Sequence, residues 1–198
     1  VGRPFTPATP QEPAGGGPSG RWDSIARHVT GVSPMSMHTL EEAFVQQLRE
    51  MFHGERQIRR MLPSLITRIW EPAFVAALTN QLLVTHTKIK RLQNAFASIS
   101  HVARGSRCEA MEGLVRGCIQ HSRRAGEPEV LDALVLAGMQ RLHSYPISGY
   151  ASLSRWAELL GFYQPRLFPV HNPEPRRRGH DGLGMLGRHT VHPYAAGP

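Results

Sequence analysis

A chain of 198 residues with a net charge of +8 has the length of one domain flanked by tails. Its basic residues are nearly all Arg, which indicates a coding bias, and no nucleic-acid-binding motif accompanies them, so nucleic-acid binding is not favoured. No stretch approaches the roughly 20 apolar residues of a membrane span, so we expect no membrane protein.

The 19 Gly and 16 Pro residues are concentrated at the two ends of the chain. We therefore expect a disordered N-terminal extension over residues 1–36, a folded helical domain over 37–168, and a disordered tail rich in Pro, Gly, Arg and His over 169–198. The chain begins with Val, and Met35 and Met37 stand just before the first helical pattern, so we also consider that translation starts at one of them.

The two cysteines, Cys108 and Cys118, are too few for a disulfide framework and lie ten positions apart on one predicted helix. A helix rises about 15 Å over that separation, which is too far for a bridge between them. Unpaired thiols indicate a reducing compartment, so we predict a cytoplasmic location. Both cysteines lie on an apolar face, where an inert buried thiol is expected.

The first predicted helix covers residues 39–61, because apolar side chains recur there at steps of three and four. Thr39 suits the N-cap and Glu42 stands at the capping-box spacing. Pro63 is expected to end or kink this helix. Glu55 falls inside the apolar stripe, where a carboxylate requires a partner or a purpose.

The second predicted helix covers residues 72–100, with Pro72 in its first turn. Gln81 and Thr85 interrupt its apolar face, and they are either metal-site remnants or hydrogen-bonded polar groups of the core. A third, shorter helix is expected over 108–124. A fourth starts near Glu129, and Pro146 is expected to kink or break it.

Five short stretches of the sequence, taken together in order and spacing, carry a family resemblance. They are Thr39–Phe44 with Leu48, Gly54–Ile58, Cys108–Leu114, Val130–Ala133, and Tyr150 with Ala157–Gly161. This combination resembles the YciE/YciF family of ferritin-like proteins, a bacterial family of unknown biochemical function linked to stress responses. The resemblance implies an all-α fold, a ferritin-like antiparallel helical bundle with carboxylates and histidines in its core.

The resemblance also implies that the metal ligands of such a core are largely lost here. Glu55 matches the family's glutamate in the first helix, but the His and Glu positions of the second helix are occupied by Gln81 and Val84. In the fourth helix the family's Glu-His-Tyr-Glu reads His143 to Pro146. A di-metal bundle site draws ligands from four helices, so we predict a remnant rather than a working site.

The candidate metal residues are therefore Glu55, His143 and Glu112, with iron or manganese expected only if a site survives, and with no other cofactor. Glu112 is either a ligand or a cap or salt-bridge group at a helix crossing, and we favour the second interpretation. For Glu55, the expected partners are Gln81, His143 or a buried water.

The family's last helix is expected to be missing or unformed, because the Pro- and Gly-rich tail after Phe168 stands in its place. Its absence would leave an apolar groove, and we predict that the chain forms a homodimer through its bundle helices.

Three functional hypotheses follow from these patterns. The first is a stress-associated ferritin-like protein that lacks an intact di-metal site and acts by self-association or partner binding. The second is a ferritin-type metal-binding protein or oxidoreductase. The third is a basic accessory protein that contacts nucleic acid through the Arg-rich tail at Arg176–Arg178. No nucleophile or phosphate-binding motif is present in the sequence, which favours a non-catalytic role, and no small-molecule substrate is indicated.

Overall fold

The computed structural model describes residues 36–162 and Val191. Within that part the chain forms four helices and no strand: α2 (Leu40–Ile66), α3 (Pro72–Ser98), α4 (Glu109–Ser122) and α5 (Pro128–Leu159). The all-α prediction is confirmed. The chain divides into two compact units, Val1–His38 and Thr39–Pro198, and all four helices belong to the second. The predicted disordered tails and the fate of the last family helix lie outside the described residues.

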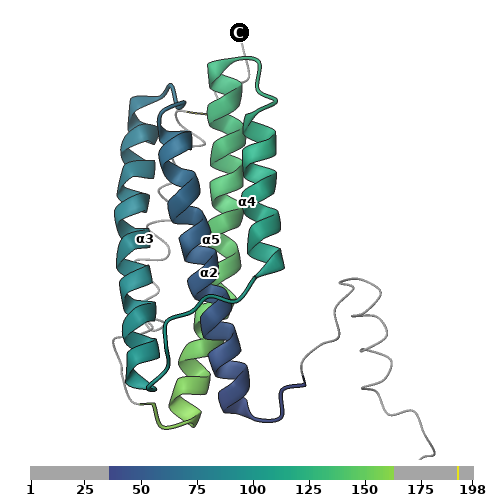
Figure 1. Cartoon of the computed structure of the whole chain (residues 1–198). Helices are drawn as coiled ribbons and strands as arrows, with labels where there is room; N and C mark the ends of the chain where they lie inside the picture. Colours follow the sequence, from purple (N-terminus) through teal and green to yellow (C-terminus); the bar gives the residue numbers. More distant parts are fainter. Residues whose placement is uncertain (1–35, 163–190, 192–198) are drawn as a thin grey trace, which may run out of the picture. The chain divides into compact units, whose positions relative to one another are not determined.

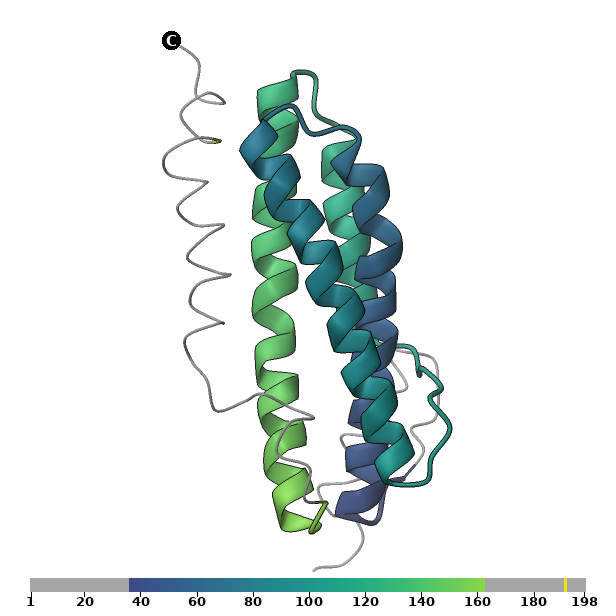
Figure 2. The same cartoon turned by 90° about the vertical axis from the view of Figure 1, so that its left-hand side faces the viewer.

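The four helices run alternately up and down, with α2 beside α3 and α4 beside α5, and α2 also contacts α4 and α5 (Figures 1 and 2). The connection from α3 to α4 crosses the outer side of α2 (Figure 1). Two backbone groups hold it there: Ser106 N donates to the Arg49 carbonyl at 3.2 Å, and Cys108 N donates to His53 Nδ1 at 3.4 Å. Together with α4, the segment between α3 and α5 (residues 99–127) forms the single long crossover that characterises ferritin-like bundles.

Local signals placed the start of α2 correctly, but of the two effects expected at Pro63, a helix end or a kink, the helix end does not occur. Thr39 and Glu42 form a complete capping box. The helix then continues through Pro63 to Ile66. Pro63 lies on the exposed side, where water can satisfy the carbonyl that loses its donor, while Leu62 and Leu65 are buried and hold the last turns against the core.

Of the two effects expected at Pro146, a kink or a break, the break does not occur, because α5 is continuous from Pro128 to Leu159. A proline inside a helix costs about 3 kcal/mol. Leu142 and Leu153, on either side of it, are fully buried, and burying one such side chain contributes about 1.5–3 kcal/mol. Packing on both sides of the proline therefore offsets its local cost. Gly161 has φ +72°, as expected for a residue that ends a helix.

The core consists of two apolar clusters. The first contains the C-terminal half of α2, the start of α3, all buried apolar residues of α4 and the N-terminal half of α5, together with Val191, which is only 2% exposed. The second joins the start of α2, the end of α3 and the end of α5, and includes the Phe52 and Phe96 rings in edge contact at 5.8 Å. Glu55 lies on α2 between Phe52 of the second cluster and Ile58 of the first.

The α4–α5 contact is tight at Gly138, so we expect Gly138→Ala to destabilise the fold by about 1–3 kcal/mol through overpacking. An added Cβ there would lie 3.0 Å from Cys118 Cβ and closer still to its sulfur. Urea unfolding would measure the change. Gly117→Ala on α4 is the matched control, because outside its own helix backbone and chain neighbours no atom of the described residues lies within 4 Å of its added Cβ, and it should be neutral or stabilising by up to about 1 kcal/mol. Equal effects from both variants would contradict this account.

Candidate functional site

A layer of polar side chains separates the two apolar clusters at mid-height of the bundle. Its centre is Glu55, which is 1% exposed and comes from α2. Lys88 of α3 and Tyr150 of α5 approach it from the neighbouring helices. Glu55 lies on the apolar face of α2 and its side chain is buried, as the sequence predicted. Its partners belong to α3 and α5, which are distant in the sequence.

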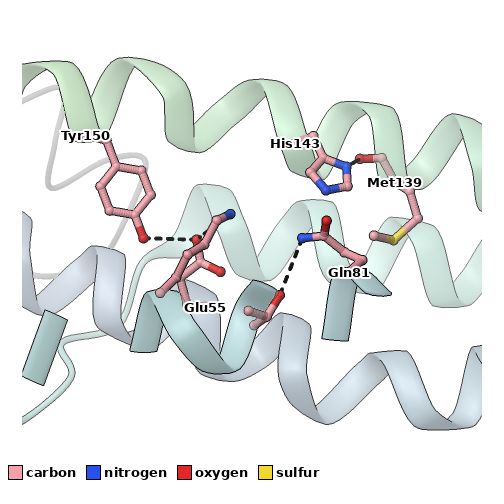
Figure 3. A network of polar contacts seen from close by, with 7 residues as sticks. Glu55, Gln81, Met139, His143 and Tyr150 are labelled. Carbon is pink, nitrogen blue, oxygen red and sulfur yellow. Dashed lines mark hydrogen bonds and ion pairs between the residues drawn. The ribbon is translucent and has the colours of Figure 1, made fainter. Parts of the chain in front are cut away.

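One oxygen of the Glu55 carboxylate has two partners. Tyr150 Oη donates a hydrogen bond to Oε1 at 3.0 Å (Figure 3). Lys88 Nζ forms an ion pair with the same atom at 3.1 Å. The Lys88 nitrogen also lies 6.0 Å from the centre of the Tyr150 ring. The second oxygen, Oε2, is buried and accepts no hydrogen bond within the described part of the chain. In the described part of the chain, the counter-charge of Lys88 and the hydrogen bond of Tyr150 both act on Oε1.

Tyr150 acts as a donor to this carboxylate and keeps its proton. Burial, reinforced by the negative charge of Glu55, raises the pKa of Tyr150 well above its ordinary value of 10.0. The hydroxyl is therefore protonated throughout the physiological range. The combination of Lys88 charge and Tyr150 hydrogen bond can hold a carboxylate in an apolar core.

Gln81 and His143, which we expected as partners of Glu55, form other hydrogen bonds in the described part of the chain. His143 Nδ1 lies 2.9 Å from the Met139 carbonyl, and Gln81 Nε2 donates to Thr85 Oγ1 at 3.4 Å. Figure 3 shows both side chains further along the bundle than the Tyr150–Glu55 contact. The Gln81–Thr85 bond supports the interpretation of these two residues as hydrogen-bonded polar groups of the core.

Glu112 lies in an ion pair near the start of α4. Its Oε2 accepts from Arg107 Nε at 2.7 Å, and the Glu112 side chain is one-third exposed. This hydrogen bond lowers the pKa of Glu112 below its ordinary value. The position agrees with the salt-bridge interpretation that the sequence favoured.

The three candidate metal residues are therefore dispersed. Among the residues that the structure describes, no three His, Cys, Asp or Glu side chains gather in a way that could hold a metal ion. Glu55, Glu112 and His143 do not form one ligand set, and the described side chains around Glu55 do not offer the several carboxylate oxygens that a di-metal pair needs.

Two residues that sequence reasoning missed organise the bundle. Lys88 is one of two lysines in a chain whose other basic residues are all Arg, and that rarity is the signal that could have marked it. Asp132 on α5 is buried, and its two oxygens accept from the backbone N–H groups of Trp70 at 3.2 Å and Glu71 at 2.9 Å. It therefore caps the turn that leads into α3.

The cysteines are buried free thiols. Burial raises the pKa of Cys118 to about 11, so this thiol is protonated and unreactive at neutral pH. Cys108 is the residue before α4, and its sulfur lies 3.6 Å from Tyr145 Oη. That contact, with burial, raises the pKa of Tyr145 to about 12.

Fold and site together define a ferritin-like four-helix bundle in which a lysine and a tyrosine surround the core glutamate. Residues 39–166 match the family described as "Domain of unknown function (DUF892)", and the chain belongs to that family. Protein YciF of Escherichia coli strain K12 is 30% identical over 129 residues, which cover 65% of this chain and 78% of that protein.

Two solved structures share the fold. The crystal structure of the E. coli stress protein YciF has a TM-score of 0.71 and 27% identity, covering 79% of this chain and 99% of that one. YcfI, described as a putative structural protein from Rhodopseudomonas palustris, has a TM-score of 0.70 and 28% identity, covering 75% and 95%. None of the described helices is long and apolar enough to cross a membrane.

Proposed function

We propose that this chain is a stress-associated bundle protein that acts by self-association or partner binding, without di-metal chemistry at its core. The observation that carries the proposal is the Lys88–Glu55 ion pair, which engages the one carboxylate that matches the family's ligand pattern. The relatives support it: one is called a stress protein and another a putative structural protein. Two buried free thiols support a cytoplasmic location.

An exposed apolar strip on α3 supports a homodimer through the bundle helices. Leu83 is 61% exposed and Val84 beside it is also exposed. Neighbouring exposed aliphatic side chains on one helix are a common feature of association surfaces. A symmetric pairing of this strip with its copy in a second chain would bury both residues in each protomer.

We expect Leu83→Glu to weaken dimer formation at least about tenfold, because a charge would be placed in an apolar contact. Light scattering over a concentration series would measure the dissociation constant. Leu159→Glu is the matched control: Leu159 is 60% exposed, at the end of α5, and its replacement should leave the constant unchanged.

Wild-type protein purified without a histidine tag would also be assayed for bound metal. A monomeric wild type, or equal effects from Leu83→Glu and Leu159→Glu, would refute association through this strip. About two iron or manganese ions per chain, lost in Glu55→Ala, would support the ferritin-type alternative instead.

A further inference from the structure

We infer that Lys88 is a built-in cation that takes the place of a metal charge beside Glu55. This inference rests on the proposed absence of di-metal chemistry and gives that absence a physical cause. The polar layer of the bundle would then be complete without any bound ion. Lys88 is a positioning residue of the core, since it acts through its ion pair with the Glu55 carboxylate.

The need for a cation follows from the burial of Glu55. A carboxylate that is 1% exposed loses nearly all of its hydration, and an uncompensated charge in that position is strongly destabilising. Tyr150 supplies a hydrogen bond but no charge. In the described part of the chain, Lys88 is the cation paired with Glu55, with its nitrogen 3.1 Å from Oε1.

Lys88 reaches the core from the side of the bundle. Its side chain is 26% exposed, so the aliphatic stem spans the distance from the surface to the buried carboxylate. An ammonium is a compact point charge with three donors, in contrast to the broad planar guanidinium of Arg. It can therefore fit between Glu55 Oε1 and the face of the Tyr150 ring, where its nitrogen is 6.0 Å from the ring centre.

The use of lysine here contrasts with the rest of the sequence. Lys88 and Lys90 are the only lysines among 23 basic residues. Lys90 lies two positions further along α3, which turns it away from Lys88, and its side chain is exposed. Lys90 is thus a control of the same residue type on the same helix.

The arrangement of the two carboxylate oxygens gives the inference a specific test. Oε1 has two partners, whereas the buried Oε2 accepts nothing from the described residues. Removing the ammonium leaves a buried carboxylate that lacks a counter-charge, which should lower the stability of the variant. Wild type, in which Lys88 supplies that charge, should gain no stability from a divalent cation such as Mn²⁺.

The experiment compares thermal unfolding of the full chain and its Lys88→Met, Lys90→Met and Lys88→Met/Glu55→Gln variants, with chelator and with millimolar Mn²⁺. In chelator, the melting temperature of Lys88→Met should be about 5 °C below that of wild type. This shift is smaller than the one expected for a fully buried ion pair, because Lys88 is partly exposed. Lys90→Met should melt within about 1 °C of wild type, and Glu55→Gln should restore much of the loss. Mn²⁺ should leave the melting temperature of wild type unchanged, because the polar layer needs no bound ion.

Several outcomes would overturn the inference. Lys88→Met could prove as stable as Lys90→Met, or Glu55→Gln could fail to restore stability or folding. Mn²⁺ stabilisation of wild type would contradict the inference and also the proposed lack of metal chemistry. The association proposal fails separately, through the Leu83→Glu measurement, because Leu83 does not belong to this site.

Discussion

Asp132→Ala is expected to lower the free energy of unfolding by about 3 kcal/mol, because two backbone donors lose a charged acceptor. The N–H groups of Trp70 and Glu71 both donate to the Asp132 carboxylate, at 3.2 and 2.9 Å. This carboxylate is buried, so water does not readily replace it. The substitution removes the link between α5 and the turn that starts α3. Urea unfolding of the variant and wild type would measure the difference.

Two comparisons separate this role from a general effect of charge removal. Asp132→Asn keeps one carbonyl oxygen as an acceptor and should cost about 1–2 kcal/mol. Glu158→Ala, on the same helix, removes an exposed ion pair with Arg155 at 3.1 Å and should change stability by less than about 1 kcal/mol. If Asp132→Ala were no more destabilising than Glu158→Ala, the capping role of Asp132 would be refuted.

Tyr150→Phe is expected to cost about 1–3 kcal/mol at neutral pH and to flatten the loss of stability in alkali. The first effect arises because Glu55 loses its uncharged donor. The second follows from linkage: the folded chain raises the pKa of Tyr150 well above 10.0, so it binds the phenol proton more tightly than the unfolded chain does. That stabilisation is complete below about pH 10 and is lost as the pH rises through the folded-state pKa.

Stability curves from urea unfolding between pH 8 and about 12 would test this, since they extend beyond the ordinary tyrosine pKa. Cys118, with its pKa raised from 9.0 to about 11, gives a decline in the same direction that begins earlier, from about pH 9. Both proteins retain Cys118, so the difference between their curves isolates Tyr150. Parallel declines above pH 10 would show that Tyr150 does not contribute as described.

The helices themselves were predictable because their signals are local. Thr39 and Glu42 form the expected capping box, and the stripe of apolar residues identified the face of α2 that carries Glu55 inward. The family resemblance agreed with these patterns and with the confirmed bundle. Such features depend on spacings of three and four residues, which one sequence displays directly.

At two prolines, the expectation that the helix would end or break was wrong. Pro63 and Pro146 both carry a strong local preference to interrupt a helix, and both lie inside continuous helices. The free energy that overrides this preference comes from burial of neighbouring leucines against other helices. That contribution depends on tertiary packing, which the spacing of residues along one helix does not reveal.

The sequence by itself determined that a glutamate would be buried in an all-helical bundle, and its family resemblance predicted that most of the family's metal-ligand positions had changed. Only the tertiary structure decided what meets that glutamate. Lys88 and Tyr150 belong to two other helices, and the crossing of α2, α3 and α5 brings them to one oxygen. Periodicity places a side chain on a face of its own helix, but which side chains meet across helices depends on how those helices pack.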